Sequence, residues 1–256
     1  MENLPLYLLL AVFGFFAVWD GIRPARKFEK IPLWRAKGIL FLVLGLAVSS
    51  AVPLLTDEWL ARHQLIDASG LGIAGGAIVG LLVTQLVGYW WHRALHRVPL
   101  LWRFHQMHHS AERVDIYGSL YFHPVDIAGF TLMGSVALVL LVGVRPEAAV
   151  IASITSTCIA IFGHANVKTP RWLGYIVQRP ENHAVHHERG VHAYNYGDFA
   201  CWDLVFGTHK NPETWNAKAG FYHGASRRIG ALLLTADVSE EPRDSAAPST
   251  REPLVA

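Results

Sequence analysis

Five apolar stretches separated by polar segments dominate the chain up to residue 163. They cover residues 4–19, 38–55, 71–91, 127–144 and 148–163. A helix needs about 20 apolar residues to cross a bilayer, with a range near 17–25. The third stretch reaches this length, whereas the first and fifth are short enough to cross obliquely or to end part way. The pattern predicts an all-α integral membrane protein with about four to five transmembrane or membrane-embedded helices.

The polar connections predict how these helices are oriented. The fourth and fifth stretches are joined only by Arg145, Pro146 and Glu147, which requires an antiparallel hairpin. By the positive-inside rule the basic loop after the first stretch faces the cytoplasm. Alternation then places the segments that follow residues 91 and 163 on that same side, at the inner membrane if the cell is bacterial. The loop is basic through Arg23, Arg26, Lys27, Lys30, Arg35 and Lys37.

Composition agrees with a membrane protein and excludes some other classes. The 256 residues are 52% hydrophobic and only 16% charged, against about 25% charged in typical soluble domains. A formal net charge of +2 without a basic stripe gives no indication of nucleic-acid binding. Cys158 and Cys201 form no CxxC pattern, so neither a disulfide framework nor a thiolate metal site is expected. The N-terminal stretch lacks the features of a cleavable signal and is expected to stay as a helix.

Histidines form three tight clusters next to the apolar stretches. The first is a pair spaced i, i+4, and the other two repeat an HxxHH pattern, which indicates two similar half-sites. At these spacings the side chains of one cluster can share one helix face. The clusters are His92 and His96; His105, His108 and His109; and His183, His186 and His187.

So many imidazoles point to bound metal. Eight nitrogens exceed the needs of one tetrahedral zinc ion, so two ions with four or five ligands each fit better. Imidazole suits iron, copper, nickel or zinc, of which only the redox-active metals activate oxygen. The chain has no HExxH motif, and it lacks the Glu-x-x-His pairs of soluble di-iron bundles.

The remaining segments add smaller expectations. Residues 1–239 are expected to form one membrane-embedded domain with its motif core at 90–228, and 240–256 to be a disordered tail. Residues 170–177 are typical of a short interfacial helix. Glycines in the third stretch favour close helix packing over room for a substrate. They are Gly72, Gly75, Gly76 and Gly80.

The histidine motifs together resemble the fatty acid hydroxylase / sterol desaturase superfamily. The resemblance covers roughly residues 90–228 and rests on the segments at 92–96, 101–110, 121–124, 163–166, 170–173, 182–187 and 195–208. It implies a helical membrane oxygenase with a cytoplasmic helical cap that holds two iron ions, although zinc can replace iron during purification. Such enzymes use O2 and two electrons to hydroxylate or desaturate a C–H position of a lipid.

The resemblance also implies a set of ligands. Lys168 stands where some members of that family have a further histidine, so the tenth ligand is open between His123 and His192. Side chains expected to orient the ligands are Asp126, Asn166, Asn182 and Asp198. The implied ligands are His92, His96, His105, His108, His109, His164, His183, His186 and His187.

The expected partners are an apolar substrate from the bilayer and a separate electron donor. The chain carries no flavin, haem or ferredoxin motif, so a ferredoxin, a cytochrome b5-like protein or a reductase must supply electrons. Arginines near the clusters are candidates for docking an acidic donor, namely Arg97, Arg103, Arg171 and Arg179. The alternatives left open are a zinc-dependent membrane hydrolase and a membrane metal-binding or transport protein; substrate and oligomeric state are not encoded in a readable motif.

Overall fold

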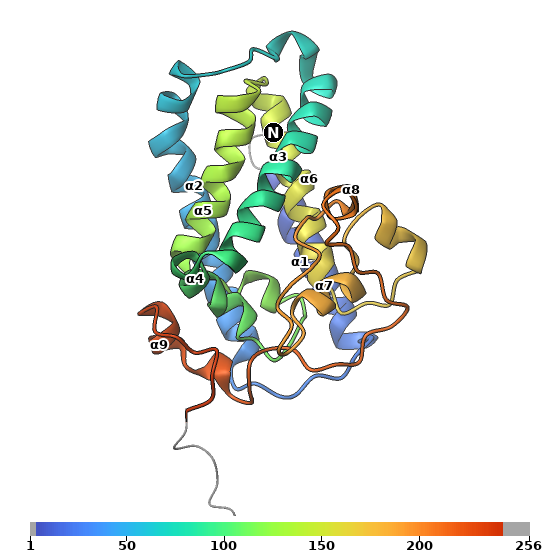
Figure 1. The fold of residues 1–256 in the computed structure, drawn as a ribbon. Helices are drawn as coiled ribbons and strands as arrows, with labels where there is room; N and C mark the ends of the chain where they lie inside the picture. The colour runs from blue at the N-terminus through green and yellow to red at the C-terminus, as the bar shows by residue number, and fades with distance from the viewer. Residues whose placement is uncertain (1–3, 243–256) are drawn as a thin grey trace, which may run out of the picture.

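The computed structural model describes residues 4–242, and within this range it contains helices, two isolated β-bridges and no strand. Five long helices run side by side, while the short elements gather at one end of them (Figure 1). The long helices are α1 (Leu4–Ile22), α2 (Trp34–Arg62), α3 (Gly72–Arg97), α5 (Pro124–Ser135), which continues as the π-helical segment η3 (Val136–Leu141), and α6 (Pro146–His164).

All short elements but one form a cap at one end of the long helices. They are separated by loops, and most of them follow the last long helix in sequence. The exception is η1 (Ser69–Leu71), which precedes α3 and lies at the opposite end. The cap consists of α4 (Pro99–His109), η2 (Gly118–Leu120), η4 (Arg171–Tyr175), α7 (Pro180–His186), α8 (Ala200–Val205), η5 (Ala225–Arg227) and α9 (Ile229–Leu233).

The expected membrane helices are confirmed. Each of the five predicted stretches corresponds to one long helical segment, except that the fourth helix ends at Leu141 and residues 142–144 belong to the turn; all five segments are long and apolar enough to cross a membrane. Their outer faces carry exposed leucine, isoleucine and valine side chains, which a soluble protein would bury. The hairpin between the fourth and fifth stretches is also present, with Gly143 at φ 55° and Pro146 at the first turn of α6. The chain is therefore an integral membrane protein.

Small residues let α3 approach both α6 and η3 closely. A Cβ at Gly76 would lie 3.0 Å from the Cβ of Ala148, and one at Gly80 would lie 2.7 Å from Cδ2 of Leu138. For these two glycines the expected close packing is found, because there is no space beside them for a substrate chain. Gly72 and Gly75 do not meet α6 in this way.

A matched pair of glycine substitutions in α3 tests this packing. Gly80→Leu forces Leu138 and α6 away, and overpacking of this kind costs about 1–3 kcal/mol or more. Gly88→Leu is the control, because nothing lies within 4 Å of a Cβ at Gly88. We expect a clearly lower thermal unfolding midpoint for the Gly80 variant in detergent and little change for the Gly88 variant. Equal midpoints would contradict the packing described here.

The cap is attached to the basic loop and to the first half of α2. Trp34 and Phe41 of α2 pack with Met107, Tyr121 and Phe221 of the cap in one buried cluster. The basic loop runs along the same end, where the backbone N–H of Ala25 donates to the carbonyl of Asn166 at 3.0 Å. The basic loop and the histidine clusters therefore share one end of the molecule, as expected; that this end faces the cytoplasm stays a prediction.

Two smaller expectations concern the ends of the cap. A short helix is present within residues 170–177 as expected, namely the 3-10 helix η4, which leaves Trp172 63% and Tyr175 52% exposed; its place at the membrane interface stays a prediction. Of the expected tail, residues 243–256 lie outside the described residues. The division of the chain at residue 239 stays a prediction.

Candidate metal centre

Four helices bring nine histidines together at the cap end of the bundle. The last two turns of α3 carry the first pair, α4 carries the second cluster, α6 ends in His164, and α7 with the residue that follows it carries the third cluster. Helical spacing places the side chains of each cluster on neighbouring turns, so that they extend from one helix into the same space.

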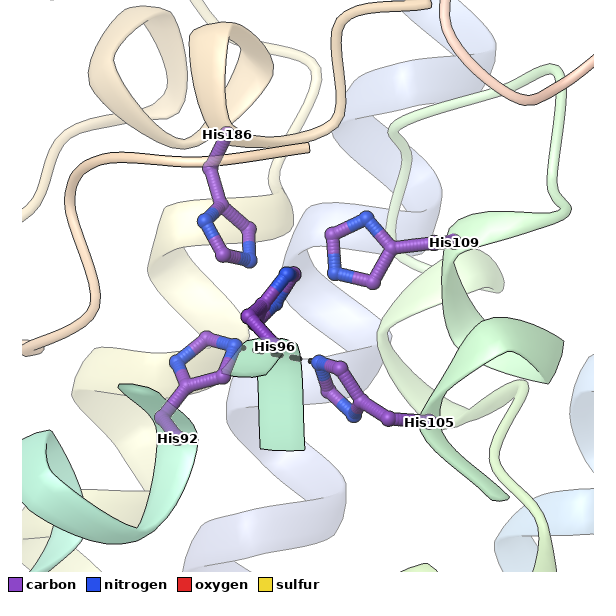
Figure 2. Close-up of side chains that lie close together, drawn as sticks. All are labelled: His92, His96, His105, His109 and His186. Carbon is purple, nitrogen blue, oxygen red and sulfur yellow. Dashed lines mark hydrogen bonds between the residues drawn. The ribbon is translucent and has the colours of Figure 1, made fainter. Parts of the chain in front are cut away.

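The nine histidines fall into two groups, in each of which one ring nitrogen per residue lies within 4.8 Å of all the others. Figure 2 shows the rings of the first group pointing toward a common centre. The five-histidine group consists of His92, His96, His105, His109 and His186, and the four-histidine group of His108, His164, His183 and His187.

Each HxxHH cluster contributes to both groups. The i, i+4 pair of α4, His105 and His109, belongs to the five-histidine group, whereas His108 belongs to the other. For the cluster on α7 the assignment is reversed: His183 and His187 share the four-histidine group, and His186 crosses to the five-histidine group. The repeated pattern thus ties two adjacent sites together and does not build one site per cluster.

Hydrogen bonds on the outer side of the rings fix which nitrogen carries the proton. Nδ1 of His92 lies 2.8 Å from the carbonyl oxygen of Tyr196, and Nδ1 of His186 lies 2.7 Å from that of Tyr194. Nδ1 of His164 lies 3.0 Å from the carbonyl oxygen of Ala160. A carbonyl only accepts, so Nδ1 is the donor in each ring and the inward Nε2 presents a lone pair.

The inward nitrogens crowd lone pairs against one another. In the four-histidine group, Nε2 of His164 lies 2.8 Å from Nε2 of His183, and in both rings the outer Nδ1 is the donor, so two lone pairs face each other. In the other group, Nε2 atoms of His96, His109 and His186 are buried without a hydrogen-bond partner. Buried, converging lone pairs repel each other unless a cation lies among them. Both groups therefore fit a metal ion, one in each.

Burial also prepares the rings for metal. It is the main cause that holds the pKa of His108, His109, His183, His186 and His187 well below the ordinary value. Each of these rings is therefore neutral at pH 7, and a metal ion does not have to displace a proton from it.

Of the four side chains expected to orient the ligands, one makes a hydrogen bond to a ligand ring. Oδ2 of Asp126 lies 2.8 Å from Nδ1 of His105. Asn166 instead donates to Asp20 and to the carbonyl of Arg26. These asparagine bonds hold the basic loop and do not reach a ring of either group.

The other two expected side chains also act elsewhere among the described residues. Asn182 accepts from Nε of Arg179 at 3.1 Å, and Asp198 accepts from Gln85 at 3.5 Å. Burial raises the pKa of Asp198 to about 6. Neither of these bonds reaches a ring of the two histidine groups, so closeness in sequence to the clusters was not enough to identify these two side chains as partners of the rings.

The two candidates for a tenth ligand differ in position. His123 caps α5 through Nδ1, which accepts from the N–H of Val125 at 3.1 Å, and it lies in neither group. His192 lies beside the five-histidine group, with Nδ1 3.1 Å from Nδ1 of His109 and a buried, unpartnered Nε2. His192 therefore lies on the outer side of the His109 ring and, like His123, belongs to neither group, so the identity of a tenth ligand stays a prediction.

Gln178 was not predicted from the sequence. Its Oε1 accepts from Nδ1 of His183, and its amide donates to the carbonyl of Gly197 at 3.0 Å. A lone glutamine two residues before a helix has no recognisable spacing. The backbone carbonyls of Tyr194 and Tyr196 were not identified either, since any residue type could supply them.

Asp203 holds the loop that supplies those carbonyls. Its carboxylate accepts from the N–H groups of Tyr196 and Gly197 at 2.9 and 2.8 Å and from Oγ1 of Thr208 at 2.6 Å. Because the side chain is 1% exposed, water does not compete for these bonds.

We expect Asp203→Ala to lower stability and metal retention together. Unpairing buried donors costs about 1–3 kcal/mol each, and the freed loop no longer fixes the rings of His92 and His186. The thermal midpoint and the metal content of the purified protein measure the two effects. Glu213→Ala, which removes an exposed carboxylate, is the control. A variant that kept full metal content after losing stability would show that the loop does not orient the rings.

An apolar pocket of about 360 Å³ lies beside the five-histidine group, between α2, α3, α4 and α5. Asp126 connects the pocket with the five-histidine group, because this residue lines the pocket and its carboxylate is hydrogen-bonded to the ring of His105. The lining consists of Val52, Leu55, Thr56, Trp91, Leu95, Leu101, Phe104, Val125, Asp126, Ala128, Gly129 and Leu132.

Comparison with known proteins places this geometry in a family. The model of the family described as Fatty acid hydroxylase matches residues 77–208, which is more than half of the chain and includes all nine histidines. No solved structure matches.

Curated relatives agree with the family match. The chain is 29% identical over 173 residues to ornithine lipid hydroxylase OlsE of Rhizobium tropici, covering 66% of this chain and 52% of the relative. It is 26% identical over 146 residues to sphinganine C4-monooxygenase 1 of Arabidopsis thaliana, covering 55% and 56%. It is 29% identical over 228 residues to lathosterol oxidase of Mus musculus, covering 83% and 73%. The chain thus spans about half the length of the first two relatives.

Proposed function

Because this chain belongs to the fatty acid hydroxylase / sterol desaturase superfamily, we propose that it is an O2-dependent membrane oxygenase that hydroxylates or desaturates a C–H position of a lipid-like substrate. The observation that carries the proposal is the pair of adjacent histidine groups, whose buried neutral nitrogens converge beside an apolar pocket. The relatives' printed names, an ornithine lipid hydroxylase and a sphinganine monooxygenase, support a lipid as substrate.

The five- and four-histidine groups would each hold one iron ion. When bound, the iron pair supplies the redox chemistry by which, in hydroxylation, one atom of O2 enters a C–H bond and the other leaves as water, with two electrons and two protons consumed. In desaturation two hydrogens leave the substrate and both oxygen atoms become water.

The chain's own residues would position and protect the reacting groups. Asp126, Gln178 and the carbonyls of Tyr194 and Tyr196 hold ring orientations. The rings of Phe122 and Phe130 lie against His108 and His92, with centroids 3.9 and 5.8 Å apart, and they exclude water from that side. Apolar surroundings of this kind keep a reactive site dry.

Electrons would come from a separate protein at the cap end, which we place in the cytoplasm. Arg97, Arg103 and Arg171 are exposed there and remain candidates for docking an acidic donor. Arg179 is not one, because it is fully buried and bonded within the cap. For Arg179 the expectation from the sequence is wrong, because closeness to a histidine cluster in sequence does not place a charge at the surface.

The two alternatives find less support in the geometry. A zinc hydrolase needs a carboxylate base directed into the centre, and among residues 4–242 no carboxylate joins either histidine group. A transport protein is expected to carry ligands along the membrane spans, whereas all nine histidines lie at one end.

The test is an isotope experiment on protein purified without air and loaded with ferrous iron. The protein in lipid nanodiscs is incubated with a total membrane lipid extract, a chemical reductant and oxygen-18 gas, and lipids are compared by mass spectrometry. We expect about two irons per chain and a lipid that gains one oxygen-18 atom, or one that loses two hydrogens. The zinc-loaded protein is the control and should leave the lipids unchanged. Turnover with zinc but without O2 would contradict the proposal and favour the hydrolase.

A further inference from the structure

One face of α8 is apolar and exposed. Cys201, Leu204 and Val205 are spaced i, i+3 and i+4, so their side chains lie on one side of this helix, and all three are exposed. Leu204 is 48% and Val205 68% exposed. The opposite side holds Ala200 and Asp203, which are buried. In water, such a face would expose leucine and valine side chains with no charged group among them.

The 3-10 helix η4 adjoins α8 and exposes apolar side chains as well. The two elements are in contact, and the N–H of Ala200 donates to the carbonyl of Ile176 at 3.1 Å. An isolated β-bridge between Val177 and Phe199 also joins them. Residues 171–177 and 198–206 thus form one unit, which we call the α8–η4 lobe. Its exposed apolar side chains are Trp172, Tyr175, Ile176, Cys201, Leu204 and Val205.

The lobe is held beside the membrane-spanning part of α3. The N–H of Phe199, directly before α8, donates to Oε1 of Gln85 at 3.2 Å. The ring of Phe206, directly after α8, stacks on that of Tyr89, with centroids 5.0 Å apart. Gln85 lies within the third apolar stretch, seven residues before His92, which is roughly 10 Å along a helix that rises about 1.5 Å per residue. Figure 1 shows α8 beside the long helices, farther from the cap end than α7, so the lobe reaches the depth of the membrane span.

The irregular backbone that precedes α8 is suited to this depth. Non-helical backbone is tolerated at membrane depth where it is buried in protein and its polar groups are bonded internally. The N–H groups at positions 195–197 and 199–200 all donate to acceptors within the protein. The side-chain amide of Gln178 donates to the carbonyls of Asn195 and Gly197. These backbone groups therefore need no water.

The lobe also continues the lipid-facing surface of α3. Trp90 is exposed, and its ring contacts that of Phe206 with centroids 4.8 Å apart. Farther from the cap, Leu82 and Ile78 are exposed on the part of α3 that is able to span the membrane. Large exposed apolar patches mark contacts with membranes or with other proteins. Because lipid covers the adjoining surface of α3, continuity favours the bilayer as the partner of the lobe.

We propose that the α8–η4 lobe is inserted into the membrane leaflet at the cap end, with the exposed face of α8 against acyl chains and the aromatic rings of η4 at the headgroup boundary. Tryptophan and tyrosine are enriched at this boundary because their rings are amphipathic. The partner is the lipid bilayer, and a second copy of the chain on the same face is the alternative that the experiment excludes. Since His92 lies about two turns nearer the cap than Gln85, insertion holds the five-histidine group at the level of the headgroups.

A fluorescent probe on Cys201 measures insertion directly, because this cysteine lies on the exposed face of α8. Cys158→Ser leaves Cys201 as the single cysteine of the chain. The full-length protein is labelled with NBD at this position and reconstituted in phosphatidylcholine nanodiscs. Quenching by lipids that carry a nitroxide on the acyl chain is compared with quenching by iodide in the water. Two reference positions are labelled in a background without other cysteines, Ile78→Cys on the lipid-facing side of α3 and Lys218→Cys on the exposed surface of the cap.

We expect the probe at position 201 to behave like the probe at position 78. A helix face inserted at the boundary of headgroups and acyl chains is buried by about 5–10 Å, so the nitroxide lipid should quench this probe at least about threefold more strongly than the probe at position 218. Iodide should quench it at least about threefold less. Val205→Glu places a carboxylate on the same face and should increase the quenching by iodide, because a charge in the bilayer is costly. Leu234→Glu, at an exposed site outside the lobe, is the control and should leave the quenching unchanged.

Three results would overturn the insertion. Iodide quenching at position 201 as strong as at position 218 would place α8 in water. Protection of the probe from both quenchers would show that protein covers this face, and energy transfer between donor- and acceptor-labelled chains would then identify a second copy. Unchanged quenching by both reagents in Val205→Glu would show that the face does not lie against acyl chains. None of these measurements uses bound iron or lipid oxidation, so their result is independent of the proposed function.

Discussion

His183→Ala is expected to remove one metal ion from the protein, and His186→Ala is expected only to weaken the binding of the other. The two residues lie three positions apart on α7, and both are buried. They differ in the group they join, since His183 is one of four histidines and His186 one of five. Losing His183 leaves three ligands, whereas losing His186 leaves four.

Metal analysis under two iron concentrations measures this difference. Protein purified without air should carry about two irons per chain as wild type and about one as His183→Ala even with iron in excess. His186→Ala should approach two irons in excess iron and lose one during dialysis. We expect its iron affinity at that site to fall at least about 100-fold, since changes to side chains that only support a ligand already cost about 10–100-fold. Lipid oxidation should be lost in His183→Ala, and in His186→Ala it should follow the iron content and be lost after dialysis, since the chemistry needs both ions in place.

One result would contradict the division into two groups. If both variants lost both ions together, the nine histidines would act as one cooperative site, and the separation seen between the groups would not describe the bound state. His63→Ala is the control, because His63 is exposed at the end of α2 and far from the cap.

The sequence predicted the features that depend on local periodicity. Apolar length located the five long helices, and i, i+4 spacing located three of the four segments that carry ligands. His164 is the exception, since it stands alone after an apolar stretch and was found only through its resemblance to a family motif. Its partners in space, His108 and His183, lie 56 and 19 residues away.

What the sequence could not predict is how loops bring atoms to the outer side of the rings. The loop after α7 turns through three non-glycine residues with positive φ, His192, Tyr194 and Asn195. This conformation directs the carbonyls of Tyr194 and Tyr196 at His186 and His92. A backbone carbonyl has no residue type to recognise, and left-handed conformations outside glycine are rare enough that no pattern predicts three together.

The crossed assignment of the HxxHH clusters has the same origin. Periodicity shows that His105, His108 and His109 can share a helix face, but which metal each ring faces depends on the helix packed opposite. Here the ring of His109 on α4 stacks on that of His187, with centroids 4.2 Å apart, although each belongs to a different group. The sequence therefore predicted the nine histidines as one set and could not divide them between the two groups.

Arg179→Met is expected to destabilise the cap more than any surface change, because this arginine anchors the start of α7. It is fully buried, with Nε 2.8 Å from Oδ1 of Asn211 and Nη1 3.1 Å from both the carbonyl of Thr169 and Oε2 of Glu181. Removing one partner of a buried ion pair costs about 3–5 kcal/mol, chiefly because the other charge is left unpaired.

The comparison of variants shows whether that cost comes from the pair or from the arginine alone. We expect a strongly lowered thermal midpoint for Arg179→Met and a partial recovery for Arg179→Met combined with Glu181→Gln, which removes the unpaired charge. Arg179→Lys should recover little, because an ammonium group cannot replace the planar guanidinium that reaches Asn211 and Thr169 together. Arg171→Met, at an exposed site, should change little. Since α7 and the residue after it carry three of the nine histidines, metal content should fall with the midpoint; if the midpoint fell while both ions stayed bound, α7 would be held by the metal ions and not by Arg179.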